Sequence, residues 1–135
     1  MNLLIRVKST KTHDIYNYMD GPLKNLLVVD LTRVLVGPYC TMILSDLGAR
    51  VIKVEAPEIG DDSRKFGPFI KDYSAYFMSL NRGKESIALN LKNTDDKKIF
   101  DKILSKADIL VENFKPGTLE TVSYTHLTLP TTPYV

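Results

Sequence analysis

The chain has 135 residues, of which 44% are hydrophobic and 25% charged, as is typical of one globular domain or part of one. Its formal charge of +2 comes from residues 1–18, because residues 19–120 carry 15 basic and 15 acidic side chains. This balance argues against nucleic-acid binding, which needs a basic face, and no apolar run is long enough to span a bilayer. The single cysteine, Cys40, excludes a disulfide framework and a cysteine zinc site, and it favours a cytoplasmic location.

The first predicted unit is a strand, a helix and a second strand. Residues 26–31 form a short apolar run, which predicts a strand buried on both faces of a parallel sheet. Gly37 and Pro38 open the helix, because proline in the first turn loses no hydrogen bond, and Gly48 ends it. Residues 51–54 form the second strand. We therefore expect two parallel strands joined by a right-handed helical crossover.

The turn of this unit argues against a dinucleotide cofactor. A G-x-G-x-x-G turn lets backbone N–H groups approach a pyrophosphate, whereas residues 32–36 carry bulky side chains in place of the early glycines. Glu55 ends the second strand, where a ribose-binding acid would lie. One acid without the glycines is a weak indication, so a nucleotide-binding oxidoreductase or a simple binding module is kept only as an alternative.

A loop rich in proline and glycine follows over residues 56–69, and its length indicates a functional loop. We expect a short helix over residues 74–80 and a strand over residues 86–91. A second long helix is predicted to begin at Thr94 as N-cap, with two aspartates in its first turn. Its apolar face should consist of Ile99, Phe100, Ile103, Leu104 and Ala107.

The last predicted strand covers residues 109–111, so that several strands end at the same edge of the sheet. This edge would hold cations that could bind a phosphorylated ligand, or that merely solvate loops. Asp30 is expected to be structural, because it can hydrogen-bond the turn after its strand, and Cys40 is expected in the core. The cations are Arg33, Arg64, Lys92 and Lys115.

Several stretches of the chain resemble one family in their order and spacing. They include VDLTRVLVGP at residues 29–38, DLGARVIKVE at 46–55, NRGKESI at 81–87 and ADILVENFKPGTL at 107–119. Over residues 22–120 the chain resembles the class III CoA-transferases, or CaiB/BaiF family. This family includes formyl-CoA transferase, carnitine CoA-transferase and α-methylacyl-CoA racemase.

The resemblance implies an α/β fold, a Rossmann-like parallel sheet with crossover helices, in an interlocked homodimer when full length. It implies a CoA-transferase that moves CoA from an acyl-CoA donor to a small carboxylic acid through an aspartyl intermediate, without a metal. That nucleophilic aspartate would lie beyond Glu120, so no catalytic residue is assigned here. An acyl-CoA racemase of the same family is the alternative, and its acid/base groups would also lie outside this segment.

The resemblance further implies which residues bind CoA. The loop before the first helix would touch CoA, residues 89–92 would line the adenosine, and residues 113–115 would follow the nucleotide and pantetheine. Ala56 stands where many members have an arginine, so one charge contact is missing. The implied CoA-binding residues are Leu35, Val36, Ala56, Leu89, Asn90, Leu91, Lys92, Asn113, Phe114 and Lys115.

Both ends of the chain are predicted to lie outside the fold. Residues 1–18 are interpreted as a leader of doubtful origin, and residues 19–120 as the N-terminal part of the family's large domain. Residues 121–135 carry no charge and show no periodicity. They can be encoded by the end of a transposase-type sequencing adapter, so we interpret them as non-native and the chain as a fragment.

Overall fold

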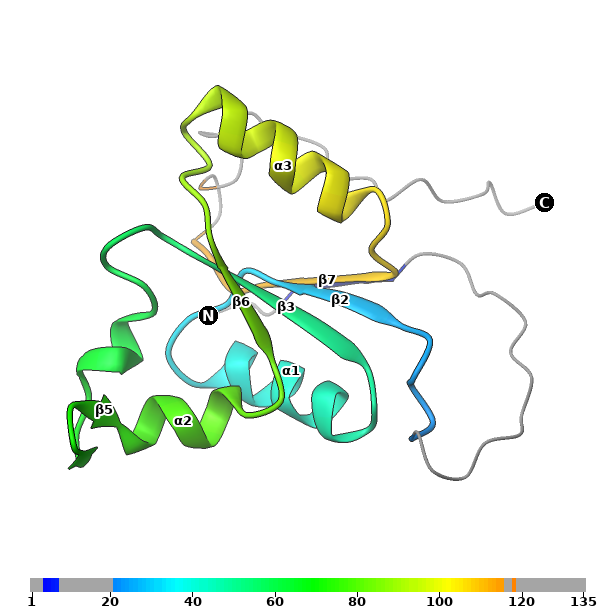
Figure 1. Cartoon of the computed structure of the whole chain (residues 1–135). Helices are drawn as coiled ribbons and strands as arrows, with labels where there is room; N and C mark the ends of the chain where they lie inside the picture. The colour runs from blue at the N-terminus through cyan, green and yellow to red at the C-terminus, as the bar shows by residue number, and fades with distance from the viewer. Residues whose placement is uncertain (1–3, 8–20, 116–117, 119–135) are drawn as a thin grey trace.

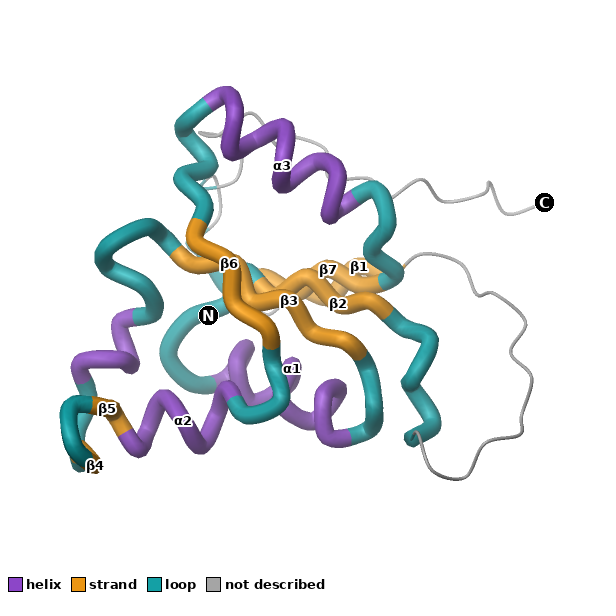
Figure 2. The backbone as a smooth tube through the Cα atoms, viewed as in Figure 1, coloured by secondary structure: helices purple, strands orange, loops and turns teal. Residues whose placement is uncertain are grey.

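A twisted sheet with helices on both faces forms the body of the protein (Figure 1). The computed structural model describes residues 4–7, 21–115 and 118. Helix α1 lies against one face of the sheet with α2 beside it on the same side, and α3 lies against the other face (Figure 2). The strands of the sheet are β1 (Leu4–Val7), β2 (Leu27–Asp30), β3 (Arg50–Glu55), β6 (Glu85–Ala88) and β7 (Ile109–Glu112). The helices are α1 (Val36–Asp46), α2 (Ala75–Asn81) and α3 (Thr94–Leu104).

The sheet has the strand order β1-β7-β2-β3-β6, and four of its strands run parallel. In the first parallel pair, Leu27 of β2 lies opposite Arg50 of β3, and Asp30 lies opposite Lys53. Strand β7 pairs with the other side of β2, and β6 pairs with β3. The predicted α/β fold with a parallel sheet is therefore confirmed.

One edge strand was not predicted. β1 pairs antiparallel with β7, with Leu4 opposite Glu112, whereas the prediction placed residues 1–18 outside the fold. A four-residue strand has too little periodicity to be recognised, and its partner is about a hundred residues away in the sequence. The predicted non-native segment, residues 121–135, lies outside the described residues.

The loop after β3, which was predicted only as a loop, contains short elements of regular structure. They are the 3-10 helix η1 (Asp62–Lys65) and the two-stranded hairpin β4 (Phe69–Ile70) and β5 (Tyr73–Ser74). Gly48 has φ +97° directly after α1, which confirms it as the residue that ends this helix. Among the described residues, no helix is both long enough and apolar enough to cross a membrane.

The start of α3 lies one residue from the predicted position of its cap. Asn93 is the N-cap, and its side-chain oxygen accepts hydrogen bonds from the backbone N–H of Asp95 at 2.8 Å and of Asp96 at 3.2 Å. Asparagine is a better cap than threonine, so Thr94 instead becomes the first helical residue. The two aspartates lie in the first turn, as predicted.

The hydrophobic core lies on both faces of the sheet, because successive residues of a strand point to opposite sides. On the face covered by α3, Val29 and Phe100 are fully buried. On the face covered by α1, Val28 packs with Val51. Strand β2 is therefore buried on both faces, as predicted. Ile99 was predicted to share the apolar face of α3, but its exposed fraction is 44%.

The contrast between Phe100 and Ile99 gives a test of this core. Phe100→Ala should lower the free energy of unfolding by about 3–5 kcal/mol, because it leaves a cavity beneath α3. Ile99→Ala, one residue away on the same helix, should cost less than about 1 kcal/mol because much of that side chain already contacts water. Urea denaturation followed by circular dichroism measures both, and equal losses would contradict the orientation of α3.

Candidate functional site

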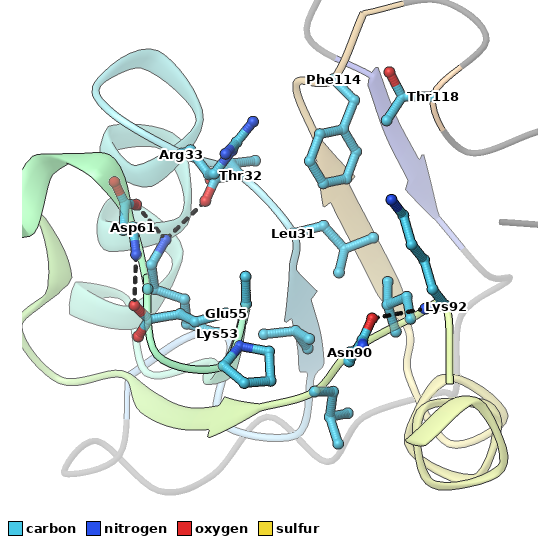
Figure 3. A pocket seen from close by; sticks show the side chains of 16 residues that line it. Leu31, Thr32, Arg33, Lys53, Glu55, Asp61, Asn90, Lys92, Phe114 and Thr118 are labelled. Atoms are coloured by element: carbon cyan, nitrogen blue, oxygen red, sulfur yellow. Dashed lines mark hydrogen bonds and ion pairs between the residues drawn. The ribbon is translucent and has the colours of Figure 1, made fainter. Parts of the chain in front are cut away.

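A pocket of about 410 Å³ opens where the parallel strands end. It lies at the carboxyl ends of β2 and β3, which is where ligands bind in open α/β sheets. The segments that follow β6 and β7 complete its lining (Figure 3). The apolar part of the lining consists mainly of Leu31, Leu89, Leu91 and Phe114.

Six of the ten predicted CoA-binding residues line this pocket. They are Ala56, Leu89, Asn90, Leu91, Lys92 and Phe114. The other four are not lining residues: Leu35 and Val36 are each 46% exposed at the start of α1, and Lys115 is exposed. The side-chain amide of Asn113 is hydrogen-bonded to the backbone of Arg33. The strand-end arrangement therefore brings most of the predicted residues together.

A buried ion pair that was not predicted forms the floor of the pocket. The Lys53 ammonium lies 2.8 Å from Asp61 Oδ2 and donates a hydrogen bond to the carbonyl oxygen of Thr32 at 2.7 Å. The two charged side chains are only 2% and 0% exposed. The sequence signal that could have predicted this pair is the position of Lys53 between apolar residues of β3, since a buried lysine needs a charged partner.

Glu55 is the centre of a second group of charges. Its carboxylate accepts two hydrogen bonds from Arg64, each at 2.7 Å, and one from Ser86 Oγ at 2.7 Å. The backbone N–H of Asp61 donates a fourth at 2.9 Å. Arg64 also stacks over the ring of Phe77 at 3.7 Å. The sequence left open whether Arg64 binds a ligand or merely solvates its loop, and in the structure its guanidinium is bound to Glu55.

The surroundings of both acids keep them ionised at neutral pH. Burial by itself raises the pKa of Glu55, but the hydrogen bonds from Arg64, Ser86 and the Asp61 backbone outweigh burial and hold the pKa below its ordinary value. Burial likewise raises the pKa of Asp61, and contact with Lys53 and Ser63 reverses the direction. The floor of the pocket therefore consists of paired charges.

Asp30 is structural, as predicted. One of its oxygens accepts a hydrogen bond from the backbone N–H of Thr32 at 2.8 Å. The other accepts from Thr41 Oγ1 at 2.6 Å and from the Lys84 ammonium at 3.1 Å. Burial lowers the pKa of Lys84, and the neighbouring Asp30 opposes this shift. This role of Lys84 was not predicted, because no local feature of its turn indicates that the side chain points into the protein. There its ammonium group donates three hydrogen bonds.

The rim of the pocket carries the charges that a ligand can reach. Arg33 lies over the ring of Phe114 at 5.8 Å and forms an ion pair with Asp62 at 3.4 Å, where both side chains are about half exposed. Lys92 is exposed. Figure 3 shows Arg33 on one side of Leu31 and Phe114, and Lys92 on the other side. Apolar walls with cations at the rim can hold a flat ring and phosphate groups.

Cys40, which was expected in the core, does not line the pocket. Cys40 is only partly buried, and burial raises the pKa of its thiol, so a nucleophilic thiolate is disfavoured. Within residues 4–7, 21–115 and 118, no group of three or more His, Cys, Asp or Glu side chains could hold a metal ion.

The lowered carboxyl pKa values predict how stability depends on pH. A carboxyl group whose pKa is lower in the folded state stabilises the fold above its unfolded pKa, and this contribution is lost as the pH falls below about 4. Glu55→Gln should therefore make the acid-induced loss of stability shallower, although it lowers stability at pH 7. Exposed Glu58 provides the control, Glu58→Gln. Urea midpoints between pH 7 and pH 2 measure the effect, and parallel curves for Glu55→Gln and the unaltered protein would refute it.

Comparisons with known proteins agree with this architecture. The chain is 54% identical over 106 residues to the acetyl-CoA:oxalate CoA-transferase of Acetobacter aceti, covering 78% of this chain and 27% of that protein. It is 51% identical over 105 residues to the succinyl-CoA:mesaconate CoA-transferase of Haloarcula marismortui, covering 74% and 26%. A crystal structure of a CaiB/BaiF family protein from Brucella suis superposes with a TM-score of 0.73 at 40% identity, covering 80% of this chain and 30% of that one.

The matches cover most of this chain but only a small part of each relative. The chain spans about a quarter of the length of the curated relatives that it matches. The family model for CoA-transferase family III matches residues 23–132, which is most of the chain. The family model, the sequence identity to the relatives and the superposition all indicate the same family. The chain belongs to CoA-transferase family III.

Proposed function

We propose that this chain supplies the CoA-binding part of an enzyme that moves CoA from an acyl-CoA donor to a small carboxylic acid. The observation that carries the proposal is the pocket at the strand ends, where apolar walls meet the rim cations Arg33 and Lys92. The relatives named above are transferases of acetyl-CoA with oxalate and of succinyl-CoA with mesaconate, which supports small dicarboxylic acids as acceptors.

The lining matches the parts of CoA. An adenine ring can pack against Phe114 and the leucines of the wall, while the nucleotide phosphates pair with Lys92 and Arg33 at the rim. Ala56 adds no charge to this rim. Lys115 is exposed next to Phe114 in the sequence and is a further candidate for phosphate contact. The floor contributes little net charge, because Lys53 is paired with Asp61 there.

NAD fits the same place poorly. A dinucleotide site uses free N–H groups of the first turn, but here the N–H groups of Thr32, Arg33 and Val34 all donate to side chains. Glu55, the acid at the end of β3, has both oxygens hydrogen-bonded within the protein, so it is not free to bind a ribose. These contacts favour CoA over the oxidoreductase alternative.

The proposed chemistry uses an aspartate outside the described residues. Its carboxylate oxygen attacks the thioester carbon of the donor, the C–S bond breaks, and a mixed anhydride and CoA thiolate result. The thiolate attacks the aspartyl carbonyl, releasing the donor acid and leaving an aspartyl-CoA thioester. The acceptor carboxylate then attacks this thioester and releases the thiolate. Attack of the thiolate on the acceptor carbonyl of the new anhydride forms the new acyl-CoA and restores the aspartate.

An activity assay on the full-length gene product tests the transfer. With acetyl-CoA or succinyl-CoA as donor and oxalate or mesaconate as acceptor, chromatography should detect the acceptor's CoA thioester and an equal amount of released donor acid. Hydroxylamine added during turnover should trap an aspartyl hydroxamate in the protein, which mass spectrometry can locate. Exchange of the α-proton of an acyl-CoA without any CoA transfer would instead indicate the racemase.

Calorimetry on the same protein tests the binding site. Lys92→Ala should weaken CoA binding by about 1.5–3 kcal/mol, because bound CoA would exclude water from the ion pair with phosphate. Lys106→Ala removes an exposed lysine that does not line the pocket and should leave CoA affinity unchanged. Binding of NAD as tight as that of CoA, or equal affinities for the two variants, would overturn the proposed site.

A further inference from the structure

The loop between β2 and α1 is held by side chains of four other segments. The Thr32 carbonyl accepts a hydrogen bond from Lys53 on β3 at 2.7 Å. The N–H of Arg33 donates to Asn113, after β7, at 3.0 Å, and the carbonyl of Arg33 accepts from the same amide at 2.9 Å. Together with the bond that the Thr32 N–H donates to Asp30, these contacts use every backbone polar group of residues 32 and 33.

Asp61 provides the remaining support for the loop. One of its oxygens accepts the N–H of Val34 at 3.1 Å and that of Ser63 at 2.9 Å, while the other pairs with Lys53. Asp61 is also the N-cap of η1, so one carboxylate joins η1, β3 and the loop. The ion pair therefore contacts the loop twice, through the Thr32 carbonyl and the Val34 N–H.

The backbone of the loop needs such support. Val34 has φ +73°, a conformation that is strained for a β-branched residue and persists only where surrounding contacts impose it. The next residue, Leu35, is the N-cap of α1 and makes no capping hydrogen bond with its side chain. A Cβ at Gly37 would overlap the side chain of Thr32, so the first turn of α1 packs directly on the loop.

The supported loop is part of the pocket wall. Thr32 and Arg33 line the pocket, and the loop leads into Leu35 and Val36, which are exposed at the start of α1. We infer that Lys53 and Asp61 are positioning residues, which act on a bound CoA through the loop and set the place of Arg33 at the rim. This inference rests on the proposed CoA site. Asn113 has the same role from the other side, because both polar groups of its amide are bound to Arg33.

The experiment compares loop order and CoA affinity in the full-length gene product. Asp61→Ala removes the acceptor for Val34, and Asn113→Ala releases Arg33 without leaving a buried charge. Both variants should raise the Kd for CoA about tenfold, the equivalent of roughly one hydrogen bond. In the unliganded protein, amide hydrogen exchange should become faster at residues 33–36 and stay unchanged in β7.

Two further variants separate positioning from a general loss of stability. Asp61→Asn keeps an oxygen that can accept from Val34, so it should restore slow exchange in the loop and most of the CoA affinity. Val51→Ala is the matched control, because Val51 is fully buried in β3 and does not line the pocket. It should lower the Tm and leave both the loop exchange and the Kd for CoA unchanged.

The results that would contradict this inference differ from those that would contradict the proposed function. Unchanged exchange at residues 33–36 in both Asp61→Ala and Asn113→Ala would overturn the inference, whether or not CoA binds. An equal rise of Kd in Val51→Ala would also overturn it. Failure of the unaltered protein to bind CoA would contradict the proposed function, whereas faster exchange confined to the loop would still confirm that these side chains hold it.

Discussion

The buried ion pair between Lys53 and Asp61 joins three parts of the chain that are separate in sequence. Removing two charges from water is costly, and their attraction offsets this cost only where further hydrogen bonds satisfy both groups. Here the lysine also binds the Thr32 carbonyl, and the aspartate binds the Val34 and Ser63 N–H groups. The end of β3, the start of η1 and the loop after β2 therefore have one fixed arrangement.

A second buried pair supports the other side of the same turn. Asp30 and Lys84 have side chains that are 0% and 1% exposed, and Asp30 binds the backbone N–H of Thr32. Thr32 therefore lies between two lysine–aspartate pairs, one acting on its N–H and one on its carbonyl oxygen. The lysine and the aspartate of each pair neutralise each other's charge, so the proposed ligand would find its cations at the rim, in Arg33 and Lys92.

This division of charge supports the proposal that the pocket binds a long ligand with phosphates at one end. The walls are apolar and the floor is internally paired, so in the proposed complex the affinity for phosphate would depend on the side chains of Arg33 and Lys92 rather than on backbone N–H groups. Side-chain contacts of this kind suit a nucleotide lying along the rim. A pyrophosphate drawn into the first turn, as in dinucleotide folds, would need N–H groups that are already used.

The sequence by itself determined the parallel sheet, the positions of α1 and α3, and the structural role of Asp30. These depend on local signals: an apolar run in β2, Gly48 after α1, and aspartates in the first turn of α3. Parallel pairing also placed most of the predicted CoA residues at one edge. Only the tertiary structure decided the partners of Lys53, Asp61 and Arg64, the edge strand β1, and the use of the Asn113 amide on Arg33. Each of these depends on atoms from distant segments meeting within about 3 Å, the length of a hydrogen bond, and no local pattern in a sequence records such meetings.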